Sequence, residues 1–235
     1  IYKHVLNVAI LSAIIAGQMG FSVGRINLLV KSAILHDIGA LKLQQLPDAE
    51  DLDDGTKEVV KKNTQETLAR YGDLDEEVLR LITQMQELYT RESDAEIPAA
   101  LKESVNANIL YVADAYDRMT AMKSFEEPTS EVKAVRELLA DEERYNKKIV
   151  NALIHGISIL YPGVCVELTN GEKGLVITEN EDNIFEPIVL DFRNNNLYDL
   201  SDPSVKQTVE IADVMKTMDN RIKLDKSLLE EYQAN

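Results

Sequence analysis

Two histidines and two aspartates lie in apolar stretches of the sequence, where charged side chains are costly to bury. His36 and Asp37 are adjacent in AILHDIGALKL, His4 opens an apolar run near the start, and Asp114 lies in ANILYVADAYDRMTAM. A divalent cation would compensate all of these groups together. Imidazole nitrogen combined with carboxylate oxygen suits Zn, Fe, Mn or a similar ion. The residue types therefore predict a metal centre.

Each of these residues also has an ordinary structural interpretation. A histidine on an apolar helix face is often a hydrogen-bonded core residue, and an aspartate there often caps a helix or pairs with Lys or Arg. No compact signature such as a paired C-x-x-C supports the metal. Asp117, three residues after Asp114, is interpreted as a residue that orients a ligand or caps the helix, and a ligand role is open. His155 is interpreted as structural.

Helices must position these side chains, because the apolar spacing is helical up to about residue 160. We expect the first helix to end at Gly20, and the second to begin after an N-cap at Ser22 and to reach His36 or just beyond. All the expected helices are 3–19, 22–36, 56–70, 74–90, 98–122, 130–140 and 146–160. The fold class is therefore mainly α: a helical bundle over residues 1–160, followed by a small antiparallel β module.

The pattern changes after Tyr161-Pro162-Gly163 to short runs rich in β-branched residues. VCVELT, KGLVITEN, PIVLDF and QTVEIADVM read as strands, and Asn170-Gly171 is a hairpin signal. We expect a barrel-like module at 161–215 and a polar tail at 216–235. An SH3-like interaction role for this module and simple docking on the helical domain are both open.

Composition limits the classes of partner. The chain carries 41 acidic against 25 basic residues, a formal charge of −16, which repels nucleic-acid polymers and anionic membranes. Its single cysteine, Cys165, excludes an internal disulfide and indicates the cytoplasm. The apolar run near the start is too short and too polar to span a bilayer, so we expect no membrane insertion. The chain opens on Ile1 within a helical pattern, which suggests a piece of a longer protein.

The order His4, His36-Asp37 and Asp114 resembles the H…HD…D signature of the HD phosphohydrolase superfamily, and more narrowly its HD-GYP branch. HDIGALKL is similar to H-D-I-G-K-[IL]-x-[IL], and ILYVADAYDRMTAMKSFEEPTS is similar to V-A-D-x-[YF]-D-A-[LM]-T-S-x-R-P-Y-R. The resemblance covers residues 1 to about 160. It implies an HD-type bundle, a divalent metal held by all four residues, and hydrolysis of cyclic di-GMP. Asp37 would orient or deprotonate the attacking water.

The sequence departs from the HD-GYP pattern at several positions that the branch uses. Ala40 stands where the branch has lysine, Asn63 stands near one of its histidines, and Met85 and Gln86 stand near its His-His-Glu. The G-Y-P loop has no clear equivalent, since ESDAEIP in its place keeps only Pro98. We therefore expect ligands for one metal, and no nearby positive charge to offset the acidic chain.

Two hypotheses follow from this pattern. The first is a degenerate HD-GYP-like signalling domain that binds metal and has weak or no cyclic di-GMP hydrolysis. The second is an active one-metal phosphodiesterase or phosphohydrolase acting on cyclic di-GMP or another nucleotide. The expected partners are a cyclic dinucleotide or other nucleotide, with a partner protein also open. The retained ligands favour turnover, whereas the lost histidines and the missing G-Y-P loop favour binding without it.

Overall fold

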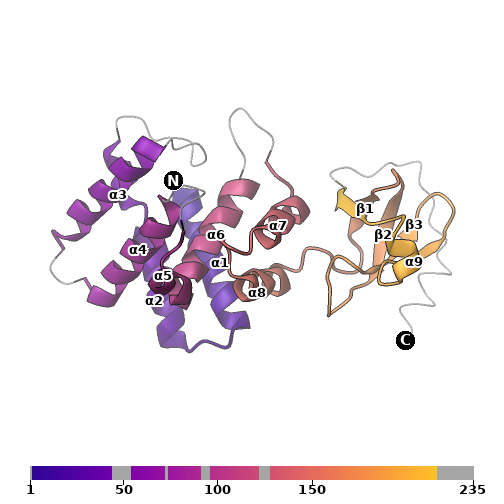
Figure 1. Ribbon diagram of the computed structural model, residues 1–235, viewed down its shortest axis with the longest axis horizontal. Helices are drawn as coiled ribbons and strands as arrows, with labels where there is room; N and C mark the ends of the chain where they lie inside the picture. Colours follow the sequence, from indigo (N-terminus) through magenta and orange to yellow (C-terminus); the bar gives the residue numbers. More distant parts are fainter. Residues whose placement is uncertain (1, 44–53, 72–73, 91–95, 122–127, 216–235) are drawn as a thin grey trace. The chain divides into compact units, whose positions relative to one another are not determined.

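Two units make up the chain, and the predicted fold class is confirmed: helices form the first unit and an antiparallel sheet forms the second (Figure 1). The computed structural model describes residues 2–43, 54–71, 74–90, 96–121 and 128–215. The first unit comprises residues 1–129 and 134–157, and the second comprises 130–133 and 158–235. The tail expected at 216–235 lies outside the described residues.

The helical unit contains all the residues predicted to do chemistry. Its elements are α1 (Tyr2–Gln18), α2 (Val23–Leu35), the 3-10 helix η1 (Ile38–Lys42), α3 (Asp54–Leu68), α4 (Glu76–Tyr89), α5 (Ala99–Glu103), α6 (Val105–Thr120), α7 (Glu131–Ala140) and α8 (Lys147–Ile157).

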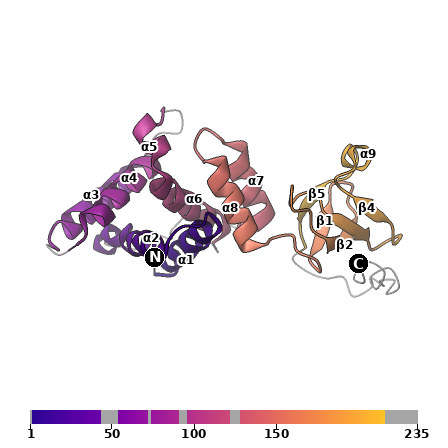
Figure 2. The ribbon, with the colours of Figure 1, turned by 90° about the horizontal axis from the view of Figure 1, so that it is seen from below.

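Helix α6 runs through the core of this unit. Every residue from 107 to 117 is buried, including Asp114 and Asp117. The helix packs against α1, α4 and α8, and α1 in turn packs against α2 (Figures 1 and 2). A helix buried on all sides is a costly place for two carboxylates, so both need partners from neighbouring helices.

Helix α1 presents one apolar face to this core. Its buried residues include His4, Val8, Ser12 and Ile15, which recur every three or four positions and so share one face. The same periodicity that buries Val8 and Ile15 therefore directs His4 inward.

The expected helix at 98–122 is interrupted, which was not predicted. Ser104 leaves helical geometry at ψ 84° and separates α5 from α6. The amide of Asn108 donates to the carbonyl oxygens of Leu101 and Ser104, at 2.8 and 2.9 Å. The same two carbonyls also accept backbone bonds, from the N–H of Ser104 and the N–H of Asn108, so the side chain reinforces the break. The helix expected at 146–160 ends earlier, at Ile157, where Ser158 adopts φ 46°.

The second unit is a five-stranded antiparallel sheet in the order β4-β3-β2-β1-β5. Its strands are β1 (Cys165–Leu168), β2 (Lys173–Thr178), β3 (Ile188–Asp191), β4 (Leu197–Asp199) and β5 (Ile211–Val214). Gly171, at φ 81°, turns the chain between β1 and β2 as the Asn-Gly signal predicts. Strand β4 and the short helix α9 (Pro203–Lys206) were not predicted.

None of the helices in the described part of the chain combines the length and the apolar character needed to cross a bilayer.

Candidate metal centre

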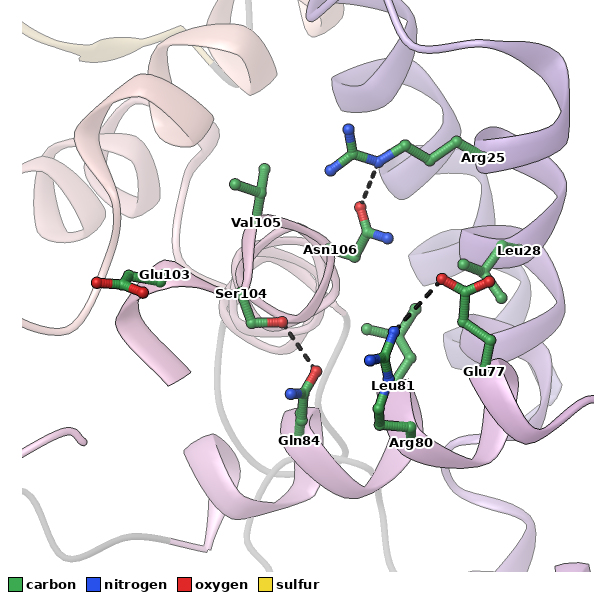
Figure 3. A pocket seen from close by; sticks show the side chains of 10 residues that line it. All are labelled: Arg25, Leu28, Glu77, Arg80, Leu81, Gln84, Glu103, Ser104, Val105 and Asn106. Carbon is green, nitrogen blue, oxygen red and sulfur yellow. Dashed lines mark hydrogen bonds and ion pairs between the residues drawn. The ribbon is translucent and has the colours of Figure 1, made fainter. Parts of the chain in front are cut away.

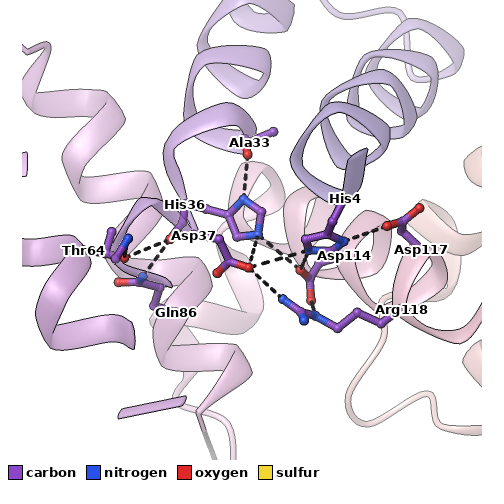
Figure 4. Close-up of polar contacts among 10 residues, drawn as sticks. His4, Ala33, His36, Asp37, Thr64, Gln86, Asp114, Asp117 and Arg118 are labelled. Atoms are coloured by element: carbon purple, nitrogen blue, oxygen red, sulfur yellow. Dashed lines mark hydrogen bonds and ion pairs between the residues drawn. The ribbon is translucent and has the colours of Figure 1, made fainter. Parts of the chain in front are cut away.

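A buried cluster of histidines and aspartates forms where α1, the end of α2 and α6 meet (Figure 4). The imidazole Nε2 of His4 lies 3.0 Å from Asp114 Oδ1, and Nε2 of His36 lies 3.3 Å from the same oxygen. His4, His36 and Asp114 each offer one ligand atom, and these atoms all lie within 4.8 Å of one another. This spacing suits three ligands of one ion.

Asp37 borders the same point. Its Oδ2 lies 3.6 Å from His36 Nε2 and 3.8 Å from His4 Nε2. The structure thus brings together His4, His36 and Asp114 most closely, with the Asp37 carboxylate beside both imidazoles.

The ring of His36 is held by the helix that it ends. Nδ1 lies 2.6 Å from the carbonyl oxygen of Ala33, and because a carbonyl only accepts, Nδ1 carries the proton. Nε2 is buried and makes no hydrogen bond with any described residue. A buried nitrogen that lies within 3.6 Å of two carboxylates and has hydrogen-bond geometry to neither fits a metal ligand, and the donor set suits Zn, Fe or Mn.

The ring of His4 is oriented from the opposite side. Its Nδ1 lies 2.6 Å from Asp117 Oδ2, and the amide of Asn7 donates to the other oxygen of Asp117 at 2.7 Å. Asp117 therefore lies behind His4, where it fixes the ring and leaves Nε2 to face Asp114. Such an outer carboxylate is a common partner of ligating histidines.

The charges of the cluster create a site that attracts cations. Burial alone would lower the pKa of His4, but hydrogen bonds to Asp114 and Asp117 outweigh it and raise the pKa to about 9. Burial likewise opposes the charged form of His36, yet the carboxylates of Asp37 and Asp114 raise its pKa. The negative potential that favours protons on these rings also favours a metal ion.

Gly39 lets the His-Asp pair come close to α3. A Cβ added at Gly39 would lie 2.3 Å from the carbonyl oxygen of Val60 and 2.4 Å from the backbone nitrogen of Thr64. The Gly39 amide donates to Thr64 Oγ1 at 3.0 Å. Close packing of η1 on α3 therefore fixes the segment that carries His36 and Asp37, and only glycine fits there.

Arg118 is a site residue that the sequence analysis missed. Its Nε donates to Asp114 Oδ2 at 2.8 Å and its Nη2 to Asp37 Oδ2 at 3.1 Å, and its guanidinium lies 4.7 Å from the centre of the Tyr89 ring. Burial opposes ionisation of Asp114, but Arg118 and the two histidines hold the pKa of that carboxyl well below its usual range.

One signal in the sequence pointed to this arginine. Asp114 and Arg118 are four residues apart on a helix, which places them on the same face. The expectation that no positive charge offsets the acidic chain near the site was wrong, because it overlooked Arg118.

The residues that depart from the HD-GYP pattern pack in the core or make hydrogen bonds that support the site. Met85 is buried in the core, Gln86 donates its amide to the carbonyl oxygen of His36 at 2.9 Å, and Asn63 donates to the carbonyl of Gly39 at 3.4 Å. Ala40 is buried and packs against Val60. His155 is exposed on α8, outside the cluster, as a residue without a metal role would be.

A separate pocket of about 160 Å³ lies between α2, α4 and the start of α6 (Figure 3). Several of its polar side chains pair with one another: Arg25 donates to Asn106 Oδ1 at 2.7 Å, and Ser104 donates to Gln84 Oε1 at 2.8 Å. None of its lining residues belongs to the cluster, so the pocket does not extend the candidate metal centre.

Comparison with known proteins agrees with this geometry. The cyclic di-GMP phosphodiesterase PdeB of Borreliella burgdorferi is 24% identical over 218 residues, which cover 88% of this chain and 56% of that protein. The chain thus spans little more than half the length of this relative. The HD domain family matches residues 1–119, about half of the chain, and the whole cluster lies within the match. The chain belongs to the HD domain family.

Proposed function

We propose that the helical unit is a divergent HD-GYP-like domain that binds one divalent transition metal and acts on or senses cyclic di-GMP. His4, His36, Asp37 and Asp114 are the proposed ligands, and the ion is Fe, Mn or Zn. The similarity to a cyclic di-GMP phosphodiesterase supports the nucleotide class. The reducing compartment indicated by the single cysteine supports a place in the cytoplasm, where a partner protein could also bind.

One observation carries this proposal. Three helices bring His4, His36 and Asp114 to one buried point, where the Nε2 of His36 makes no hydrogen bond with any residue that the structure describes. If these positions served only to fill the core, we would expect apolar side chains there, because unpaired polar atoms are costly to bury.

A bound divalent ion would supply Lewis-acid activation of water and of the phosphate. The residues of the chain then have separate roles in the reaction. Asp37, at the edge of the cluster, is the proposed residue that orients the attacking water or accepts its proton. The water oxygen bonds to phosphorus, one ester bond breaks, and the departing ribose oxygen takes a proton. Asp117 orients His4 throughout.

We expect this turnover to be slow or undetectable. Asn63, Met85 and Gln86 offer no imidazole or carboxylate where further ligands would be needed, and only one cluster of potential ligands occurs among the described residues. A single metal stabilises less of the charge that develops on the transferred phosphate than two metals do. A second candidate function, an active one-metal phosphodiesterase, is favoured by the close approach of the retained ligands.

The test combines metal content with turnover. Purified protein loaded with Mn²⁺ or Fe²⁺ should hold about one ion per chain, bind cyclic di-GMP, and hydrolyse it slowly or not at all. His36→Ala/Asp37→Ala should lose the metal, whereas His155→Ala, the matched exposed histidine, should keep it. Fast hydrolysis abolished only in the first variant would favour the active enzyme. Wild-type protein that takes up no metal would refute the centre.

A further inference from the structure

Arg118 is a cation built into the candidate metal centre. Its side chain is only 12% exposed, and it joins two carboxylates from different parts of the chain, Asp114 on α6 and Asp37 after α2. The contact with the Tyr89 ring holds the guanidinium from a third element, α4. Figure 4 shows the arginine reaching toward both carboxylates beside the two histidines.

The charge in this cluster shows what the arginine does. Asp37, Asp114 and Asp117 bring three negative charges, and all three residues are buried. One divalent ion with neutral imidazoles would leave a net charge of minus one, which opposes the approach of a phosphate. Arg118 removes that remaining charge. The centre as a whole is then neutral with one ion bound, so no net negative charge opposes a phosphate.

The same charge restricts the number of metal ions. A second divalent ion that shared an oxygen of Asp37 or Asp114 would lie against a guanidinium already bonded to those carboxylates. Arginine stays protonated in proteins, so this repulsion persists at every pH of interest. Since the guanidinium also occupies Asp114 Oδ2 and Asp37 Oδ2, it competes for the oxygens themselves.

We propose that Arg118 is the second cation of this centre: it limits the centre to one metal ion and presents a fixed positive charge to a phosphate group of the ligand. This inference rests on the proposed function, because it needs a metal beside Asp114. It identifies a determinant of phosphate binding.

Three variants separate charge from packing. Arg118→Ala removes the side chain, Arg118→Gln keeps part of the stem and an amide donor without the charge, and Arg118→Lys keeps the charge. Arg80→Ala is the matched control, because Arg80 is also paired with a carboxylate, that of Glu77 at 3.4 Å, but on an exposed surface. Circular dichroism and thermal melting identify any variant that fails to fold.

The first measurement is the binding of Mn²⁺ or Zn²⁺ alone. Wild type and Arg80→Ala should bind one ion per chain. The Gln and Ala variants should bind the ion about tenfold or more tightly, because no cation then opposes it at the ligand carboxylates. An arginine that merely held the ligands in place would give the opposite sign, and weaker metal binding in Arg118→Gln would overturn the proposal.

The second measurement is the binding of inorganic phosphate and of cyclic di-GMP to the metal-loaded protein. Arg118→Gln should lose at least tenfold in affinity for phosphate, while Arg118→Lys retains most of it. Equal phosphate affinity in wild type and Arg118→Gln would overturn the proposal even with the metal bound. If phosphate and metal behave as expected but cyclic di-GMP does not bind, the proposed nucleotide class fails and the role of Arg118 stands.

Discussion

Replacing Asp117 by asparagine tests whether the residue behind His4 tunes the metal centre. Asp117 accepts two hydrogen bonds, from His4 Nδ1 at 2.6 Å and from the amide of Asn7 at 2.7 Å. An asparagine carries one carbonyl oxygen and one NH₂ group, so it cannot accept both bonds in the same arrangement. It also removes the charge that strengthens the bond to His4.

The size of the effect follows from this geometry. Losing an outer carboxylate behind a ligating histidine typically costs 10–100-fold in metal affinity, which is about 1.4–2.7 kcal/mol. The loss arises because His4 becomes a poorer donor and its ring is held less firmly with Nε2 toward Asp114. We expect Asp117→Asn to fall in this range while its fold is retained.

The assay is competition for Zn²⁺ against a chromogenic chelator of known affinity. Asn7→Ala is the control, because it removes only the outer bond and leaves the charge of Asp117 on His4. That variant should stay closer to wild type in metal affinity than Asp117→Asn does, since the Asp117 carboxylate keeps its charge and its bond to His4. Wild-type affinity in Asp117→Asn would refute the reasoning, and His4 would then need no support from Asp117.

Three further predictions concern the scaffold. Gly39→Ala should lower the free energy of unfolding by about 1–3 kcal/mol and weaken metal binding, because the added Cβ would meet the backbone of α3. The control is Gly24→Ala, whose added Cβ has nothing within 4 Å and which should be neutral or stabilising in denaturant titrations. Asn108→Ala should cost about 0.5–1.5 kcal/mol by removing the side-chain hydrogen bonds that span the α5–α6 break, and an unchanged urea midpoint would contradict this. Burial raises the pKa of Tyr145, so its contribution to stability is complete below its unfolded pKa near 10 and is lost as the pH rises toward the folded value. At pH 11 the loss is about 1.4 kcal/mol. Tyr145→Phe should therefore show a shallower fall in melting temperature between pH 9 and pH 11 than wild type.

The sequence predicts those parts of the site that depend on one helix at a time. The apolar runs that contain His4 and Asp114 indicated helices with these side chains in apolar surroundings, and both side chains are buried. The second contact of Arg118, with Asp37, depends on how α6 meets the end of α2, which no local spacing reveals. The role of Gly39 is hidden for the same reason, because it becomes apparent only when η1 lies against α3.

The errors in the fold have local causes. The break at Ser104 lies within a strong helical pattern and is stabilised by the side chain of Asn108, four residues later. Strand β4 spans only Leu197–Asp199, which is too short for an alternating pattern to be recognised. By contrast, the change to β structure after residue 160 was clear, because β-branched runs and an Asn-Gly turn occur together there.

The origin of the cluster on three helices has a consequence for the stability of the helical unit. An ion that joins α1, the end of α2 and α6 acts as a cross-link between segments more than thirty residues apart in the chain. A ligand that binds only the folded state stabilises it by about 2.7 kcal/mol at a free concentration one hundred times its dissociation constant. The melting temperature of the protein should therefore rise with the metal concentration. A chelator should weaken the packing of α1 against α2 and α6.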